Sequence, residues 1–314
     1  MKKLVIATRK SQLALWQSEH IKALLEEAYP DMEVELSTFT TKGDKILDTP
    51  LAKIGGKGLF TKELEDAMLS GDAHIAVHSL KDVPTVFPDG LTLGAITKRE
   101  NPKDAFLSMT YEDIDSLPKG AVVGTTSLRR RMQLLSYRPD LKIKSLRGNV
   151  NTRLKKLKDG EFDAIILATA GIKRLGFEEE VKYFTPIKRS IMIPAMGQAA
   201  LGIECVDDPK IKEIVSVLND KEAFIETTIE RDFVDMLQGG CQVPIGVNAN
   251  LKSDGTIKVR AIVGMPDGSK MIKEKLVAKK SDYKHIGKEL AESLIENGAI
   301  KLLKEAEDMA QDIL

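Results

Sequence analysis

Strands and helices alternate through the first two thirds of this 314-residue chain, and this alternation constrains the fold more than any other feature. Short apolar runs such as Leu4–Ala7 and Ala73–His78 have the length of buried strands, and amphipathic stretches such as 11–28 lie between such runs. A pattern of this kind is typical of proteins with helices packed on a largely parallel sheet. We therefore expect an α/β fold.

The pattern occurs twice along the chain, and short sequence echoes accompany the repeat. A strand that passes through a hydroxyl residue into a helix occurs at 6–13 and again at 123–128. A helix followed by glycine, an acidic residue and a strand occurs at 69–76 and again at 160–166. The second block of the pattern begins near Leu91–Thr97. We expect two similar α/β domains that face each other across a cleft.

The last third of the chain changes character, because predicted strands now follow one another directly. The turn sequences Ser253-Asp254-Gly255 and Pro266-Asp267-Gly268 separate them, which indicates antiparallel pairing. Two helices, broken at Asn297-Gly298, end the sequence. The expected strands are 243–251, 257–263 and 270–277. We expect a small, separate α+β domain here.

Charge and cysteine content exclude several classes of protein. Basic and acidic residues number 47 each, so the formal net charge is zero, whereas proteins that coat nucleic acid or anionic membranes usually carry a basic surplus. No apolar run is long enough to be a membrane span or a signal peptide. Only two cysteines, Cys205 and Cys241, are present, which excludes a disulfide scaffold. We expect a cytoplasmic protein that binds neither nucleic acid nor membrane and, without an obvious association stripe, a monomer.

Positive charge is therefore expected to be local, and arginines collect where predicted strands end. Ligands of open α/β sheets bind at the carboxyl ends of strands, where a serine cap also leaves helix N–H groups for an anion. The guanidinium fork suits carboxylate or phosphate. Each residue alone could equally be a solvated charge or cap, but together they predict an anion site. The residues at these positions are Arg9, Ser11, Ser127, Arg129, Arg130, Arg147, Arg153 and Arg174.

The segment from His78 to Pro84 follows a buried strand and contains a candidate catalytic group. Asp82 could act as an acid or base, or stabilise a cation, but its position alone favours a turn-capping role. His78 follows the alternation of the strand, so we expect it to be packed in the interior. The spacings HxH, HExxH and CxxC are absent, so no metal site is predicted.

A glycine-rich connection at 42–58 does not fit a phosphate-binding loop, because Gly58 and not serine or threonine follows Lys57. We expect a mobile flap over the cleft, with an inert surface loop as the alternative. The candidate flap residues are Asp44, Lys53, Lys57 and Phe60.

The two cysteines lie in different settings. Gly239 and Gly240 precede Cys241, and they would end a helix and let other groups approach the backbone closely. We expect Cys241 to be accessible and reactive. Cys205 ends the segment Leu201-Gly202-Ile203-Glu204-Cys205, and we expect it to be a small buried hydrophobic side chain.

Taken together, these segments resemble the hydroxymethylbilane synthase family, also called porphobilinogen deaminase. The matching motifs occur in the family's order: Ala7-Thr8-Arg9, then Lys42-Gly43-Asp44 through Gly58-Leu59-Phe60, His78 to Pro84, Ser127 to Arg130, Leu146 to Asn149, and Gly239 to Gly246. The resemblance implies three domains, the first two hinged as in a periplasmic binding protein. The expected boundaries are 1–97 with 191–216 for domain 1, 98–190 for domain 2, and 217–314 for domain 3, which carries the cofactor-attachment loop 239–246.

The resemblance also implies the activity. Four porphobilinogen molecules would condense, each with loss of ammonia, onto a dipyrromethane cofactor bound covalently through Cys241, and hydrolysis would release hydroxymethylbilane for tetrapyrrole and heme biosynthesis. Asp82 would be catalytic, because it would bind pyrrole N–H groups and stabilise an azafulvene cation. The residues implied to hold cofactor carboxylates are Lys81, Ser127, Arg129, Arg130 and Arg147. Those implied to hold incoming rings or the growing polypyrrole chain are Arg9, Ser11, Arg153 and Arg174.

Two positions depart from the family pattern, and two other functions compete. Thr126 stands where serine is frequent and keeps a hydroxyl, whereas Ala199 stands where glycine is frequent and is expected to restrain a hinge strand. A cytoplasmic two-domain anion sensor would explain the arginines but gives Cys241 and Asp82 no purpose. A cysteine-nucleophile hydrolase would explain Cys241 but lacks an obvious histidine base.

Overall fold

The structure is a computed structural model that describes residues 1–45, 59–237 and 243–313. The predictions for Lys53, Lys57 and Cys241 therefore lie outside the described residues. The described chain forms two compact units, the first from 1–45, 59–100 and 199–224, and the second from 101–198, 225–237 and 243–313. The chain thus leaves the first unit after Glu100 and returns to it at Ala199. The finer division into three domains stays a prediction.

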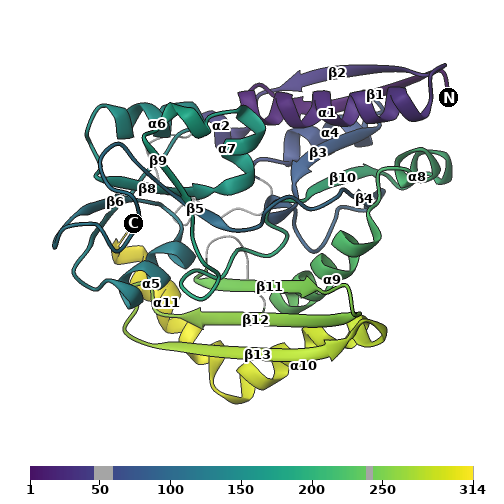
Figure 1. Cartoon of the computed structure of the whole chain (residues 1–314). Coiled ribbons are helices and arrows are strands. Elements are labelled where there is room, and N and C mark those ends of the chain that lie inside the picture. Colours follow the sequence, from purple (N-terminus) through teal and green to yellow (C-terminus); the bar gives the residue numbers. More distant parts are fainter. Residues whose placement is uncertain (46–58, 238–242, 314) are drawn as a thin grey trace. The chain divides into compact units, whose positions relative to one another are not determined.

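A five-stranded sheet forms the centre of the first unit, in the order β2-β1-β3-β10-β4 (Figure 1). β1 pairs in parallel with β2 and β3, whereas β10 is antiparallel to both β3 and β4. The strands are β1 (Lys3–Arg9), β2 (Glu33–Phe39), β3 (Ile75–Ser79), β4 (Leu91–Ile96) and β10 (Leu201–Val206), and the helices of this unit are α1 (Gln12–Ala28), α2 (Lys42–Lys45), α4 (Lys62–Leu69) and α8 (Pro209–Ser216). The expectation that a second block begins near Leu91–Thr97 is wrong, because β4 pairs with β10 in this first sheet.

A second five-stranded sheet, in the order β7-β6-β8-β5-β9, repeats this arrangement in the second unit. β6 pairs in parallel with β7 and β8, and β5 is antiparallel to β8 and β9, as β10 is to its neighbours in the first sheet. The elements are β5 (Asp104–Ser108), β6 (Val122–Gly124), β7 (Lys142–Lys144), β8 (Ala164–Ala168), β9 (Tyr183–Pro186), α5 (Leu128–Tyr137), α6 (Val150–Lys158) and α7 (Thr169–Leu175). The predicted α/β class and duplication are confirmed, although β5 and β9 were not foreseen.

The second unit also contains a three-stranded antiparallel sheet, in the order β11-β12-β13. Apolar side chains on one face of the strands pack with those of α9, α10 and α11 into a single core. The elements are α9 (Lys221–Met236), β11 (Ile245–Leu251), β12 (Thr256–Gly264), β13 (Met271–Lys279), α10 (Tyr283–Glu296) and α11 (Ala299–Ile313). The predicted α+β arrangement, with helices broken at Asn297-Gly298, is confirmed.

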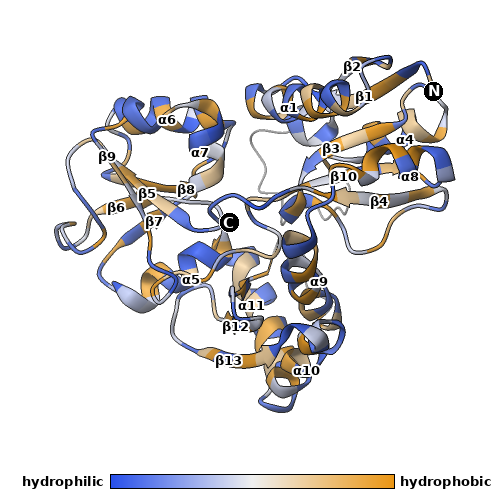
Figure 2. Cartoon of the chain, turned by 45° about the vertical axis from the view of Figure 1, so that its right-hand side comes forward, coloured by the Kyte–Doolittle hydropathy of each residue, from blue (hydrophilic) through white to orange (hydrophobic). Residues whose placement is uncertain are grey.

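Hydropathy follows this layered design. In Figure 2 the central strands β5 and β8 are largely hydrophobic, whereas the helices α1 and α6 show alternating hydrophobic and hydrophilic bands. Such banding is expected where one helix stripe faces a sheet and the other faces water. None of the helices in the described parts of the chain is long and apolar enough to cross a membrane.

Serine caps begin the first helix of each five-stranded sheet, as the sequence predicted. The Ser11 hydroxyl accepts a hydrogen bond from the Ala14 N–H at 3.4 Å, and the Ser127 hydroxyl accepts one from the Arg130 N–H, also at 3.4 Å. Each bond satisfies one of the amide groups that a helix start leaves without an internal partner. The backbone N–H groups that precede Ala14 and Arg130 lie at the helix starts, where the helix dipole is positive.

Ala199 has an unusual backbone conformation at the point where the chain returns to the first unit. Its φ angle is 79°, and it is the one residue other than glycine with a positive φ among those the structure describes. Close by, the Glu100 N–H donates to the Ala199 carbonyl at 3.2 Å, and the Thr97 N–H donates to the Leu201 carbonyl at 3.0 Å. The two segments that connect the units are therefore hydrogen-bonded to each other within the first unit, and Ala199 is held in a conformation that favours glycine.

An Ala199→Gly variant is expected to raise the free energy of unfolding by up to about 1 kcal/mol, because glycine relieves the strain at positive φ. The matched control is Ala200→Gly, next to it in the chain, which has no positive φ and is fully buried. The control is expected to destabilise the protein by roughly 1 kcal/mol through lost packing and added chain entropy. Urea unfolding measures both. Equal destabilisation by the two variants would contradict the assignment of strain to Ala199.

Candidate functional site

In the first unit, several predicted site residues lie at one edge of the sheet. β1 and β3 run in parallel with Ile6 opposite Ile75 and Ala7 opposite Ala76, so their carboxyl ends lie at the same edge. Arg9 ends β1, and a short 3₁₀ helix, η1 (Leu80–Asp82), follows β3 directly. The structure therefore brings Arg9, Ser11, Lys81 and Asp82 to a common edge, as expected for ligand-binding residues of an open α/β sheet.

Arg9 is held in a cluster with Asp44 and Phe60. Its Nε donates to Asp44 Oδ2 at 3.1 Å, a second guanidinium nitrogen contacts Asp44 Oδ1, and the guanidinium carbon lies 4.4 Å from the centre of the Phe60 ring. Asp44 also accepts hydrogen bonds from the Thr41 N–H at 3.2 Å and the Thr41 hydroxyl at 2.8 Å. The paired carboxylate and the aromatic ring fix the guanidinium plane.

The electrostatics of this cluster favour a charged pair. Partial burial alone would raise the pKa of Asp44, but the hydrogen bonds from Arg9 and Thr41 outweigh it, so the pKa lies below its ordinary value. Asp44 is therefore ionised at neutral pH and neutralises Arg9 locally. The sequence placed Asp44 and Phe60 on a separate flap, and the structure shows that the described ends of that segment contact Arg9.

Asp82 is the exposed carboxylate at this edge. It makes no hydrogen bond or ion pair through its side chain to any residue in the described ranges, and it ends the η1 turn. Beneath it, buried His78 Nε2 lies 2.9 Å from Oε2 of buried Glu204, and the Gln17 side chain donates to the Ser79 hydroxyl at 3.0 Å. The expectation that His78 is packed is confirmed. Asp82 thus extends from a rigid strand end with its oxygens available to an external donor.

In the second unit, three helices begin at one edge of the sheet. The parallel strands β6, β7 and β8 lead into α5, α6 and α7 respectively. Ser127 caps α5, and the Asn149 side chain caps α6 by accepting from the Thr152 N–H at 2.9 Å. Their helix starts supply amide donors and positive dipole ends, which suit a carboxylate or phosphate.

Two predicted arginines of the second unit, Arg147 and Arg153, lie near the start of α6, and a third, Arg174, lies at the far end of α7. Arg147 follows β7, and its neighbour Gly148 has a φ of 106°, a conformation that favours glycine. Arg153 lies in the first turn of α6, and its Nε donates to the Gly148 carbonyl at 2.8 Å. Arg174 lies in the last turn of α7, and all three arginines are partly exposed. The edge therefore presents positive charge together with helix amides.

Arg129 and Arg130 are buried, and both bind Asp104. The exposed fractions are 5% for Arg129, 6% for Arg130 and 0% for Asp104. Arg129 Nη1 lies 2.7 Å from Asp104 Oδ2, and Arg130 Nη2 lies 2.8 Å from Asp104 Oδ1. Backbone carbonyls take further bonds, from Arg129 to Ile193 at 2.7 Å and from Arg130 to Ile166 at 2.9 Å. Two positive charges face one negative charge, so the triad adds a net positive charge beneath the first turn of α5.

Sequence reasoning did not find the partners that support these arginines. Asp104 begins β5 opposite Ala168, the last residue of β8, so it lies at the same edge as the start of α5. The Gln198 amide donates to Asp104 Oδ1 at 3.2 Å and to the Pro102 carbonyl at 2.7 Å. The Gln133 side chain binds both the N–H and the carbonyl of Ile193. The one hint in the sequence is that Asp104 stands directly before the apolar run 105–107, which would place a carboxylate at the start of a buried strand.

The departure at Thr126 preserves a structural hydroxyl. Thr126 Oγ1 donates to the Leu146 carbonyl at 2.7 Å and accepts from the Leu146 N–H at 3.1 Å. These two bonds tie the end of β6 to the segment after β7. Threonine therefore supplies the contact for which a hydroxyl residue is needed at this position.

Two further expectations from the sequence concern Cys205 and metal binding. Burial raises the pKa of the Cys205 thiol to about 11, and its exposed fraction is 0%, so the expectation of a small buried hydrophobic side chain is confirmed. Within residues 1–45, 59–237 and 243–313, no group of three or more His, Cys, Asp and Glu side chains is arranged to hold a metal ion.

Comparison with known proteins gives strong matches along nearly the whole chain. A family model described as "Porphobilinogen deaminase, dipyromethane cofactor binding domain" matches residues 4–213, and "Porphobilinogen deaminase, C-terminal domain" matches residues 224–296. The porphobilinogen deaminase of Aliarcobacter butzleri is 65% identical over 310 residues, which cover 99% of each chain. That of Nitratiruptor sp. is 66% identical over 308 residues, which cover 98% of each chain.

Solved structures give a more distant likeness. A TRAP periplasmic solute binding protein from Desulfovibrio salexigens has 16% sequence identity and a TM-score of 0.42, with 70% of this chain and 73% of that chain covered.

Proposed function

The chain belongs to the porphobilinogen deaminase family, and from this premise we propose that its two sheet edges bind and join porphobilinogen molecules. The proposed reaction is a stepwise, deaminating, head-to-tail condensation of four porphobilinogens, followed by hydrolytic release of hydroxymethylbilane. One observation supports this proposal most: cations and helix amides gather at the strand ends of each unit, with one exposed carboxylate, Asp82, among them. Each substrate ring carries two carboxylates, which such edges are suited to bind.

The donor set at these edges fits a dipyrromethane cofactor. Its carboxylates would be held by the Ser127 hydroxyl, the amides at the start of α5, Arg147 and Lys81. Arg129 and Arg130 would contribute mainly the net positive charge of their triad with Asp104, because their side chains are buried. When bound through Cys241, which lies outside the described residues, the cofactor supplies the carbon atom to which the first ring is joined.

Asp82 carries the proposed chemistry. Its carboxylate would accept hydrogen bonds from pyrrole N–H groups and stabilise the positive charge that develops as ammonia leaves the substrate. It would also take up the proton that is lost when the pyrrole becomes aromatic again. Exposure at a strand end and the lack of a competing partner among the described residues make Asp82 suitable for both tasks.

Arg9, Ser11, Arg153 and Arg174 would bind the incoming ring and the growing polypyrrole chain. Arg9 is paired with Asp44. To bind a substrate carboxylate, Arg9 must either use guanidinium N–H groups that Asp44 does not occupy or release Asp44 and bind the substrate in its place. Three domains, with boundaries as expected from the sequence, and a monomeric state complete the proposal. An anion sensor is not favoured, since the family match covers nearly the whole chain.

The cofactor proposal predicts the intact mass of the purified protein. The wild type is expected to exceed its sequence mass by one dipyrromethane unit, and a Cys241→Ser variant is expected to show the sequence mass alone, because only a thiol forms the thioether. A Cys205→Ala variant is the matched control and should keep the added mass, since Cys205 is buried. Electrospray mass spectrometry measures all three. An unmodified wild type that stays unmodified after incubation with porphobilinogen would contradict the proposed function.

A further inference from the structure

The C-terminal three-stranded sheet has one face that is strongly basic. Its opposite face packs against α10 and α11 in the core, whereas this face carries the alternate residues of each strand. The register places Asn250 opposite Lys258, Arg260 opposite Lys275, and Ile262 opposite Lys273. No acidic residue lies on this face of the three strands. The cationic residues on it are Lys258, Arg260, Lys273, Lys275 and Lys279, with Lys252 directly after β11.

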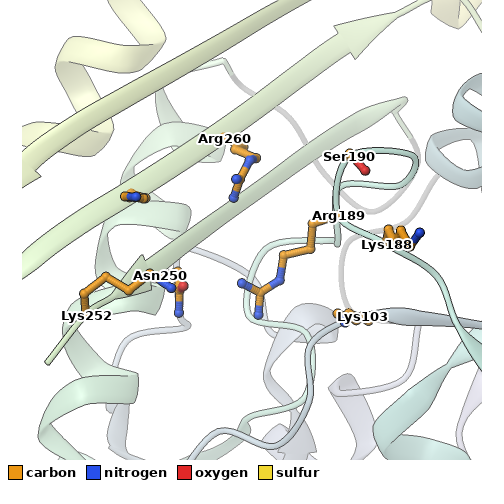
Figure 3. Close-up of a pocket in the computed structure, with 8 residues that line it drawn as sticks. Lys103, Lys188, Arg189, Ser190, Asn250, Lys252 and Arg260 are labelled. Carbon is orange, nitrogen blue, oxygen red and sulfur yellow. The ribbon is translucent and has the colours of Figure 1, made fainter.

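A pocket of about 660 Å³ lies at one end of this face, within the second unit. Strands β11 and β12 form one wall, and residues 188–190 with Lys103 form the other. Figure 3 shows Arg189 from the loop, and Asn250 and Arg260 from the strands, arranged around the same space. None of the eight lining residues is acidic, and six of them are cations. The lining residues are Lys103, Lys188, Arg189, Ser190, Asn250, Lys252, Lys258 and Arg260.

Backbone contacts hold the two walls together. The Val247 N–H of β11 donates to the Pro194 carbonyl at 3.0 Å, and a Cβ placed on Gly246 would lie only 3.0 Å from the Ile193 carbonyl oxygen. The loop itself is closed by hydrogen bonds from Ile191 and Met192 to the Lys188 carbonyl at 2.9 and 3.0 Å. The sheet and the loop therefore form one fixed frame, and the pocket does not depend on how the two units are arranged.

Five of the six cations that line this pocket lack an ion pair with the residues that the structure describes. Lys103, Lys188, Lys252, Lys258 and Arg260 form no ion pair with any residue in the described parts of the chain. The whole chain has no net charge, so this concentration of positive charge is a local feature. Like charges in a concave site repel one another and raise the local concentration of anions, and a bound anion relieves the repulsion.

We propose that this pocket binds a compact, multivalent anion that carries several phosphate or carboxylate groups. Six cations, one amide and one hydroxyl match a ligand with several negative charges and hydrogen-bond acceptors. A nucleic acid fits less well, because this face of the sheet has no aromatic side chain on which a base could stack. The site is separate from the proposed active site, since none of the residues assigned to cofactor or substrate lines it.

Calorimetric titration of the full-length holoenzyme at low ionic strength tests this proposal. Inorganic tripolyphosphate and citrate serve as separate probes for the phosphate and carboxylate forms of the ligand. The test variant is Lys258→Gln with Arg260→Gln. The control is Lys301→Gln with Lys304→Gln on α11, which removes the same charge from exposed positions on a helix that packs against the other face. Binding of at least one probe is expected to weaken at least tenfold in the test variant and less than twofold in the control.

The preferred probe assigns the ligand class. Tighter binding of tripolyphosphate indicates a phosphate ligand, and tighter binding of citrate indicates a carboxylate ligand. Turnover of porphobilinogen and the thermal midpoint should stay unchanged in the test variant, which shows that the fold and the proposed active site are intact. The proposal is overturned if neither probe shows saturable binding to the wild type, or if the two double variants weaken binding equally. It is also overturned if a single-stranded oligonucleotide binds this site more tightly than either probe.

Discussion

An Asp82→Asn variant is expected to lose at least a factor of about one hundred in turnover while keeping its fold. The amide that replaces the carboxylate cannot take up a proton and cannot stabilise a cation by charge. Asp82 is exposed and makes no side-chain hydrogen bond to other described residues, so no structural contact is lost. The rate of porphobilinogen consumption by variant and wild type measures the effect, and both enzymes should first be shown by mass to carry the cofactor.

Asp89→Asn provides the matched control for Asp82. Asp89 is an exposed aspartate in the same unit, lies in the turn before β4, and is assigned no role in binding or catalysis. Its replacement should leave turnover within about twofold of the wild type, since surface changes away from the site have small effects. Unchanged turnover in Asp82→Asn would show that the proton and the cation are handled by another group, and the proposed mechanism would be wrong.

Replacing Asp104 with asparagine is expected to lower the free energy of unfolding by about 3–5 kcal/mol. The substitution keeps the size of the side chain but leaves the guanidinium groups of Arg129 and Arg130 buried without their common counter-charge. Burial of a charge without an opposite charge is among the most destabilising changes in a protein interior. Urea unfolding followed by circular dichroism measures the loss.

Asp140→Asn is the control for this prediction. Asp140 binds Arg138 at 2.7 Å, so the chemistry of the pair is the same, but both side chains are partly exposed to water. The Arg138 hydrogen bond lowers the pKa of Asp140 to about 2, and water can replace the lost partner at this partly exposed position. Asp140→Asn should therefore cost much less than Asp104→Asn. Similar losses in both variants would show that burial of the Asp104 triad is not the cause.

Features of the fold that depend on neighbouring residues were predictable from the sequence. The serine caps at Ser11 and Ser127 are each followed within three residues by the amide they bind, and the turns of the C-terminal sheet contain their own signals. Strand and helix alternation likewise reflects burial within short segments. The position of Asp82 at a strand end followed from the same reasoning.

Contacts between distant segments were not predictable in this way. Asp104 meets Arg129 across 25 positions and Gln198 across 94, and nothing local to any of these residues indicates the others. β5 was missed because its pairing depends on β8 and β9, which lie much later in the chain. The basic face was also missed, since the alternation of β12 and β13 indicates strands but not which residues of a separate loop lie opposite them.

The position of β10 inside the first sheet has a consequence for synthesis of the protein. β10 lies between β3 and β4, yet it begins at Leu201, after every strand of the second five-stranded sheet has been made. On the ribosome, where chains emerge from the N-terminus, the second sheet can therefore close while the first still lacks its strand between β3 and β4. Until Leu201–Val206 emerges, β3 and β4 each present an unpaired edge to other chains. The sheet of the first unit is thus completed only after the second five-stranded sheet has been synthesised.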